Sequence, residues 1–155
     1  MIKVSEENFC IHSEYEALIK DNSEDGAVVF FVGLVRDFNQ GEKVSSLFLE
    51  HYPAMTLKSL SDIVELAQIK WSLGRVRLVH RVGQLAVNEQ IVFVGVSAQH
   101  RADAFSAAEF IMDKLKTQAP FWKKEQTSLG DKWVSQNQSD RERCARWNVY
   151  DEKGG

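Results

Sequence analysis

Two lysines flank an apolar and aromatic stretch in the C-terminal part of the chain. The segment KLKTQAPFWKKE, residues 114–125, places Lys116 before and Lys123 after the sequence Ala-Pro-Phe-Trp. A lysine beside buried aromatic surface loses hydration, which lowers its pKa towards the range in which an amine acts as a base or nucleophile. The alternative is structural, with both side chains lying along a hydrophobic edge and their ammonium groups in water. Structural lysines are the commoner kind, so this segment alone leaves both interpretations open.

Three further basic residues stand where elements of secondary structure are expected to end or begin. Arg36 follows the apolar run GAVVFFVGLV, and a guanidinium at a strand end can hold an anion through two parallel hydrogen bonds. His100 and Arg101 stand at the expected start of a helix, where unpaired backbone N–H groups attract phosphate or carboxylate. The alternatives are a surface salt bridge for Arg36, a capping role for His100 and a solvated Arg101.

Composition and missing motifs narrow the classes of function. The 155 residues carry a net charge of −3 and 26% charged side chains, which suits one globular domain and gives no case for binding nucleic acid or a membrane surface. No P-loop, GxGxxG, HExxH or GxSxG pattern occurs. The four histidines are scattered, and Cys10 and Cys144 lack metal-ligand spacing, so we expect neither a metal nor a disulfide. The acidic N-terminal segment is unlike a signal peptide, and we expect a cytoplasmic protein.

The elements that would position these residues follow from hydrophobic periodicity and turn residues. Apolar or alternating runs predict strands within EDGAVVFFVGLVRD, VSSLFLEHY, GRVRLVHRVG and EQIVFVGVSA, and the first run is continuous enough to be covered on both faces. Helical spacing predicts a helix over residues 54–71 and another over QHRADAFSAAEFIMDKLK, which Pro120 ends. A capping box that starts at Ser13 predicts a short helix ending near Asp21, with Cys10 before it in a strand.

The remaining segments complete an α+β pattern. PFWKKEQT is expected to be extended, SLGDKW to turn into a short strand, SDRERCARW to form a last helix, and residues 148–155 to form a flexible tail. The predicted order is therefore α-β-β-α-β-β-α-β-β-α. Because repeated βαβ crossovers are missing, this order favours an α+β fold with a mainly antiparallel or mixed sheet. No linker or internal repeat interrupts the chain, so we expect a single domain over residues 1–155.

Five blocks of the sequence together carry a family resemblance. They are EDGAVVFFVGLVRD, LEHYPAM, GRVRLVHRVG, IVFVGVSAQHRADAF and IMDKLKTQAPFWKKE. With these blocks in this order, the chain resembles the large, catalytic subunit of molybdopterin synthase, the MoaE family, over nearly its whole length. The resemblance implies an α/β-hammerhead fold with an additional antiparallel sheet. It also implies a sulfurtransferase that converts precursor Z, a cyclic pyranopterin monophosphate, into the dithiolene molybdopterin of the molybdenum cofactor.

The resemblance further implies partners and site residues. Sulfur would arrive as a thiocarboxylate on the C-terminal Gly-Gly tail of a small ubiquitin-like subunit, in a heterotetramer built on a central dimer of the large subunit. No cofactor or metal is implied. Lys116 and Lys123 would be the catalytic residues. The implied substrate-binding residues are Leu34, Val35, Arg36, His100, Arg101, Lys116, Lys123, Lys124 and Glu125.

One segment departs from the family pattern. Some relatives have a basic residue shortly after the Trp-Val of GDKWV, which reaches the site of the neighbouring subunit. This chain has WVSQNQSD there, with Ser135, Gln136 and Asn137 in the corresponding places. Either that contact is missing, or Lys132 or Arg141 replaces it.

Two other classes of function remain as alternatives. A non-catalytic module that binds a pterin phosphate would need Arg36, His100 and Arg101 but not the two lysines. A ubiquitin-like carrier is suggested by the chain's own end, Lys153-Gly154-Gly155, although carriers are shorter and lack the lysine–aromatic block. The residues also leave open which lysine acts as acid, base or electrostatic clamp.

Overall fold

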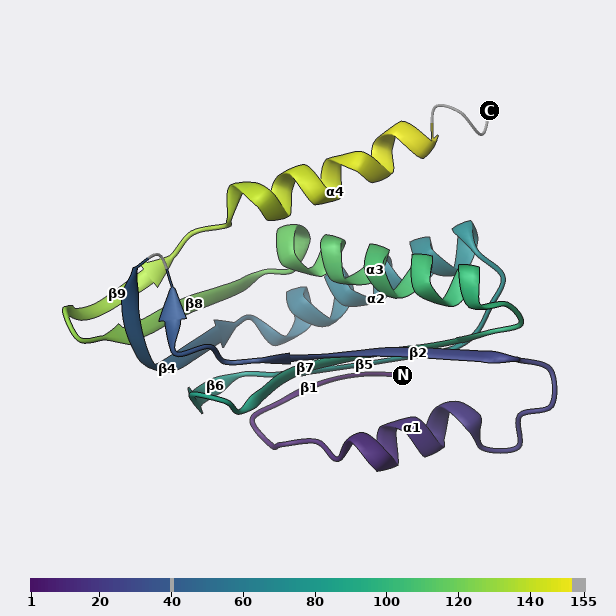
Figure 1. Ribbon diagram of the computed structural model, residues 1–155, viewed down its shortest axis with the longest axis horizontal. Helices are drawn as coiled ribbons and strands as arrows, with labels where there is room; N and C mark the ends of the chain where they lie inside the picture. The colour runs from purple at the N-terminus through teal and green to yellow at the C-terminus, as the bar shows by residue number, and fades with distance from the viewer. Residues whose placement is uncertain (40, 152–155) are drawn as a thin grey trace.

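A computed structural model describes residues 1–39 and 41–151 (Figure 1). The C-terminal Lys153-Gly154-Gly155, on which the carrier alternative rested, lies outside the described residues. The elements follow one another as β1 Ile2–Ser5, α1 Ile11–Ile19, β2 Ala27–Leu34, β3 Phe38–Asn39, β4 Glu42–His51, α2 Pro53–Lys70, β5 Leu73–Arg81, β6 Gly83–Ala86, β7 Gln90–Ala98, α3 Arg101–Gln118, β8 Phe121–Thr127, β9 Gly130–Val134 and α4 Gln138–Asp151.

The first sheet forms the centre of the molecule. Its four strands have the order β1-β5-β7-β2, with β1 parallel to β5 and the other neighbours antiparallel. Helix α1 covers one face, α2 and α3 cover the other, and α4 lies outside α3 (Figure 1). The largest buried cluster fills the space between this sheet and the helices, and it includes Leu60, Phe110, Ile111 and Trp147. The expected α+β class with a mixed sheet is confirmed.

The second sheet stands at one end of the first. One of its strands, β8, begins directly after α3. Its path is β3-β4-β8-β9, with β6 also paired to β4. Pro120 sets the transition, because Ala119 before it takes extended angles and α3 ends at Gln118. The chain therefore leaves the last turn of α3 and returns at once as a strand, as the sequence predicted.

Four local predictions differ from the structure. Helix α1 begins at Ile11, so Ser13 lies inside it rather than at its cap, and the exposed Cys10 is the N-cap residue rather than part of a strand. The earlier start lets Ile11 pack against the cluster around Phe9 and Leu18. Strand β2 is an edge strand with an exposed Phe31, so its apolar run is not covered on both faces. Strands β1, β3 and β6 were not predicted, because each is only two to four residues long.

The last helix is longer than predicted. Helix α4 runs to Asp151, four residues into the segment that was expected to be a flexible tail. Residues 152–155 lie outside the described part of the chain. Cys144 lies in α4, as predicted, and the structure shows that it is buried. Across residues 1–39 and 41–151, no helix combines the length and the apolar character that crossing a membrane requires.

Candidate active site

A cavity of about 470 Å³ lies where the two sheets, the end of α3 and the start of α4 meet. It collects most of the residues that the sequence pointed to, although they come from segments far apart in the chain. The predicted residues that line it are Leu34, Val35, Arg36, Lys116, Lys123 and Glu125. The cavity is therefore the candidate active site.

Lys116 and Lys123 reach this cavity from two consecutive elements. Lys116 belongs to the last turn of α3, and Lys123 belongs to β8, which begins just after Pro120. The reversal between helix and strand brings both side chains to the same space, although six residues lie between them in the chain. The sequence prediction that these lysines share one site agrees with this geometry.

The pleat of β8 divides the lysine–aromatic block between two faces. Phe121, Lys123 and Glu125 line the cavity, whereas Trp122 and Lys124 alternate to the other face. Trp122 packs edge-on against Tyr52, with ring centroids 5.2 Å apart.

Lys124 is accordingly engaged on the outer face of the second sheet. Its Nζ lies 5.5 Å from the ring centroid of Phe48 and 5.6 Å from that of Trp133. The structure therefore does not bring Lys124 to the cavity, and of the Ala-Pro-Phe-Trp segment Ala119 and Phe121 line it.

The two lysines differ in their exposure to water. Burial lowers the pKa of Lys123 from 10.5 to about 8, and the positive charge of the neighbouring Lys116 adds to this effect. With that pKa, roughly one Lys123 side chain in ten is a neutral amine at pH 7. Lys116 itself is exposed. The loss of hydration predicted for both lysines therefore applies to Lys123.

His80 is a cavity residue that the sequence analysis did not select. It comes from β5, is only 3% exposed and stacks on Phe121, with ring centroids 3.9 Å apart. Burial lowers its pKa to about 3, helped by the charges of Lys123 and Lys116, so the ring is neutral at physiological pH. Nδ1 lies 2.7 Å from the carbonyl oxygen of Arg81, to which it donates. The other ring nitrogen, Nε2, is then the acceptor.

A signal for His80 was present in the sequence. It shares a strand face with the core residues Val76, Leu78 and Val82 in GRVRLVHRVG, and a polar ring on an otherwise apolar face is unusual. The contact between His80 of β5 and Phe121 could not be predicted from the sequence, because the two residues are far apart in the chain. This contact places His80 in the wall of the cavity.

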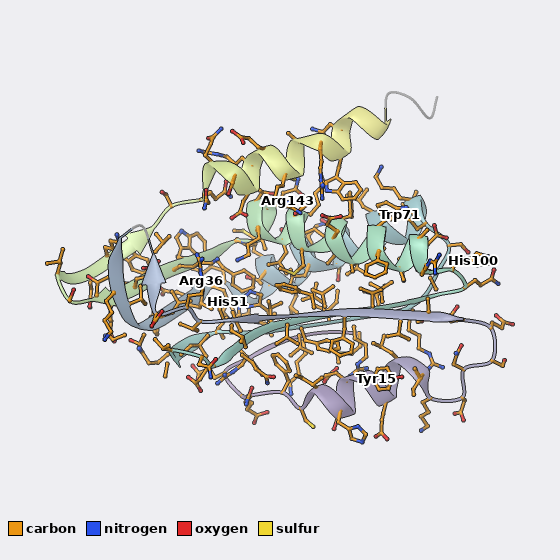
Figure 2. All side chains as sticks on the ribbon, in the orientation of Figure 1. Tyr15, Arg36, His51, Trp71, His100 and Arg143 are labelled. Atoms are coloured by element: carbon orange, nitrogen blue, oxygen red, sulfur yellow. The ribbon has the colours of Figure 1, made fainter. Side chains whose placement is uncertain are left out.

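Arg36 and His100 lie far apart along the long axis of the molecule (Figure 2). Arg36 follows β2, is exposed and lines the cavity. His100 is the N-cap residue of α3 and Arg101 is its first residue, whereas Lys116 stands in the last turn of the same helix. An α-helix of 18 residues is about 27 Å long, so a single chain does not bring His100 and Arg101 to this cavity.

The side chain of His100 does not act as a helix cap. Within the described residues it donates no capping hydrogen bond to α3 and accepts none from it, and both His100 and Arg101 are exposed. The capping alternative for His100 is therefore wrong. In a single chain, the side chains of His100 and Arg101 at the N-terminus of α3 are exposed on the surface.

The segment that departs from the family pattern forms one wall of the cavity. Val134 pairs with Lys123 across the β8–β9 ladder, and the lining continues through Ser135, Gln136 and Asn137 to Asp140. Asn137 Oδ1 accepts the backbone N–H of Ser139 at 3.0 Å and so caps α4. Asn137, one of the three residues in that segment, therefore serves as a helix cap. Arg141 lies one turn further on, where its Nη2 donates to Gln138 Oε1 at 2.8 Å.

The arrangement suits proton transfer and charge stabilisation near a bound anion. Arg36 and Lys116 supply positive charge, Lys123 exchanges a proton near neutral pH, and Phe121 with Leu34 and other apolar groups limits water. Across the part of the chain that the structure describes, no group of three or more His, Cys, Asp or Glu side chains could hold a metal ion.

Comparison with known proteins assigns the chain to a family. A family model described as MoaE protein matches residues 4–118. The molybdopterin synthase catalytic subunit of Haemophilus influenzae is 52% identical over 146 residues, which cover 94% of this chain and 97% of that protein.

Solved structures agree with this assignment. The molybdopterin biosynthesis MoaE protein of Burkholderia ambifaria is 44% identical and has a TM-score of 0.82, covering 96% of this chain and 97% of that one. Molybdopterin synthase from Staphylococcus aureus is 35% identical with a TM-score of 0.79, over 85% of this chain and 95% of that one. The chain thus belongs to the MoaE family.

Proposed function

We propose that this protein is the catalytic subunit of a molybdopterin synthase and transfers sulfur from a thiocarboxylated small subunit to precursor Z. The observation that carries the proposal is the meeting of Lys116, Lys123 and Arg36 in one cavity, with the pKa of Lys123 lowered to about 8. Relatives at about half identity that are named molybdopterin synthase catalytic subunit support it.

Each cationic group has a place in the proposed reaction. Arg36, exposed at the cavity rim, holds the phosphate of the substrate through charge-assisted hydrogen bonds. The thiocarboxylate sulfur attacks a side-chain carbon of the pterin as a C–O bond at that carbon breaks, and the ammonium groups of Lys116 and Lys123 stabilise the negative charge that develops on the leaving oxygen. Water then hydrolyses the acyl–sulfur bond, which leaves the sulfur on the pterin and a carboxylate on the tail of the small subunit. Lys123, whose amine and ammonium forms are both populated near neutral pH, moves protons as the cyclic phosphate opens.

The proposed assembly accounts for the residues that a single chain leaves apart from the cavity. We place a second copy of the chain so that its His100 and Arg101 complete the anion site of the first, in a central dimer that carries one small subunit at each end. The exposure of both residues and the helix N-terminus beneath them support this arrangement, because unpaired N–H groups and two basic side chains favour a phosphate. The narrow Gly-Gly tail of the small subunit would enter the cavity beside Lys123.

We place this reaction in the cytoplasm. Cys10 is exposed and Cys144 is buried, and both are free thiols rather than a disulfide. Unpaired cysteines are typical of a reducing compartment. Neither thiol lines the cavity, in keeping with a reaction whose sulfur comes from the partner.

Reconstitution tests the proposed function directly. The full chain is mixed with a small subunit whose thiocarboxylate has been verified by mass spectrometry, then with precursor Z, and molybdopterin is measured. Product is expected from the wild-type chain. Binding of precursor Z without any product would instead support the non-catalytic pterin-phosphate module.

A further inference from the structure

Helix α4 is held on α3 by a buried carboxylate. Asp113 Oδ2 accepts hydrogen bonds from Trp147 Nε1 at 2.8 Å and from Arg146 Nη2 at 3.1 Å. Near the end of α3, Thr117 Oγ1 lies 3.2 Å from Cys144 Sγ. These contacts join about one turn of each helix, and they fix the position of α4 relative to the end of α3.

This docking sets the first turn of α4 at the mouth of the active site. Gln136 Nε2 donates to the carbonyl oxygen of Thr117, and Asn137 caps the helix. Asp140, in the first turn, is half-buried and lines the same cavity as Lys116 and Lys123. A carboxylate therefore faces the two lysines from an element that neither of them belongs to.

We propose that Asp140 is a positioning residue for Lys123: from α4 it supplies the counter-charge that holds the Lys123 ammonium group within the partly dehydrated cavity. The inference rests on the proposed function of Lys123 and adds a residue to it. Asp140 acts through Lys123 and is not itself required to touch the substrate.

The other charged groups around Lys123 show why a counter-charge is needed. Lys116 from α3 and Arg36 after β2 are cations that line the same cavity, and burial also disfavours the charged form of Lys123. His80 from β5 is neutral and contributes no compensating charge. Only a carboxylate offsets these effects.

Among the residues that the structure describes, two carboxylates line the cavity, and Asp140 has the stronger influence on Lys123. Both raise the pKa of Lys123 against the effect of burial, but the contribution of Asp140 exceeds that of Glu125. Glu125 is only 6% exposed and lies two residues from Lys123 on the same strand. A carboxylate repels anionic substrates, so Asp140 does not help the cavity to bind them. Its stabilisation of the charged form of Lys123 explains why a carboxylate is present there.

The test follows the protonation of Lys123 in the full chain by NMR, using lysine labelled with ¹³C at Cε. The signal is assigned by its loss in Lys123→Arg. In Asp140→Asn, which keeps the shape of the side chain, the titration midpoint of Lys123 should fall by about half a pH unit or more. Asp140→Glu, which restores the charge, should return the midpoint towards that of the wild type.

The matched control is Glu142→Gln. Glu142 lies on the same helix, is exposed and accepts a hydrogen bond from Gln138 Nε2 at 3.0 Å, but it does not line the cavity. This variant removes one negative charge from α4 and should leave the midpoint of Lys123 unchanged.

Two outcomes would overturn the inference. One is an unchanged or higher Lys123 midpoint in an Asp140→Asn protein that unfolds at the wild-type temperature. The other is an equal shift in Glu142→Gln, which would mean a general charge effect. Because the NMR signal needs no substrate, it stays informative even if the chain makes no molybdopterin. Where product is formed, the limb of the pH–rate profile controlled by Lys123 should move to lower pH in Asp140→Asn.

Discussion

The imidazole of His80 stacks on the ring of Phe121, with centroids 3.9 Å and planes 15° apart. Phe121 lies two residues before Lys123 on the same face of β8, so the stacked rings line the cavity next to Lys123. The stack links the core of the first sheet to the site in the second. The aromatic ring and the neutral histidine together keep water away from one side of Lys123, which explains why burial is the main cause of its lowered pKa.

Removal of either cavity lysine should stop product formation while the fold remains. Lys116→Ala and Lys123→Ala each lose a charge or proton-transfer group at the reacting atoms, and we expect a loss of about 10²–10⁴-fold in rate. Lys114→Ala is the matched control, because Lys114 lies on α3 over the ring of Phe110 and does not line the cavity. Rates are measured in the reconstituted reaction. Wild-type turnover by both variants would refute the catalytic assignment.

Replacement of Lys123 by methionine should make the protein more stable as well as inactive. The folded-state pKa of about 8 lies below the unfolded value of 10.5, so folding is opposed by the cost of keeping Lys123 charged. That cost is fully present below pH 8 and disappears as the pH rises towards 10.5. Lys123→Met should therefore raise the free energy of unfolding by about 1–3 kcal/mol at pH 7.

Urea unfolding of Lys123→Met and wild type at pH 7 and pH 10 measures this difference. The gain should be smaller at pH 10, because most wild-type Lys123 is then neutral in the folded state. A destabilised variant at pH 7, or a gain that does not change with pH, would contradict the proposed electrostatic cost.

His80 should make the fold sensitive to acid. Its pKa of about 3 in the folded state is below its ordinary value of 6.5, so the unfolded chain takes up a proton that the folded chain does not. Stability is therefore lost as the pH falls from 6.5 towards 3, by about 1–2 kcal/mol between pH 7 and pH 5 from this group. His80→Gln should lose less stability over that interval than wild type, as measured by urea midpoints. An equal loss in both proteins would place the acid sensitivity elsewhere.

The parts of the site that could be predicted from the sequence depend on short-range relations. Lys116 and Lys123 are brought together by a helix, a proline and a strand within ten residues, and each of these has a local sequence signal. The outward direction of Lys124 follows from the same strand, although the family resemblance placed it with the substrate-binding residues. Period-two alternation by itself predicts that Lys124 lies on the face of β8 opposite to Lys123.

The remaining parts depend on pairings between distant segments. Strand β1 was missed because its four residues are held by parallel pairing to β5, where Ile2 lies opposite Leu78. Asp140 was missed because its place in the cavity depends on the docking of α4 on α3 through Asp113. No local pattern encodes such contacts, since each depends on the register of elements that are far apart in the chain.

Arg36→Ala should weaken the binding of precursor Z more than that of the small subunit. A charge-assisted contact contributes about 1.5–3 kcal/mol, so a loss of roughly tenfold to a hundredfold in affinity for the precursor is expected. Calorimetric titrations of both ligands against the same variant provide the comparison. Equal losses for both ligands would mean that Arg36 shapes the cavity as a whole.

If His100 and Arg101 serve the site of a second copy, a mixture of two variants that are each inactive alone should be active. Arg101→Ala leaves a chain with intact lysines, and Lys123→Ala leaves a chain with an intact Arg101. In an equal mixture with free exchange, half of the dimers are mixed. Each mixed dimer then has one site with both groups, so about a quarter of wild-type activity should return.

The complementing pair needs its own control. Lys116→Ala mixed with Lys123→Ala should remain inactive, because both lysines of a cavity come from the same chain. No pairing of these two variants therefore gives a cavity with both lysines. If the mixture of Arg101→Ala with Lys123→Ala also stays inactive despite verified subunit exchange, the two basic residues at the start of α3 do not complete a neighbour's site. Activity in the reconstituted reaction, set against the amount of mixed dimer measured by native mass spectrometry, distinguishes these outcomes.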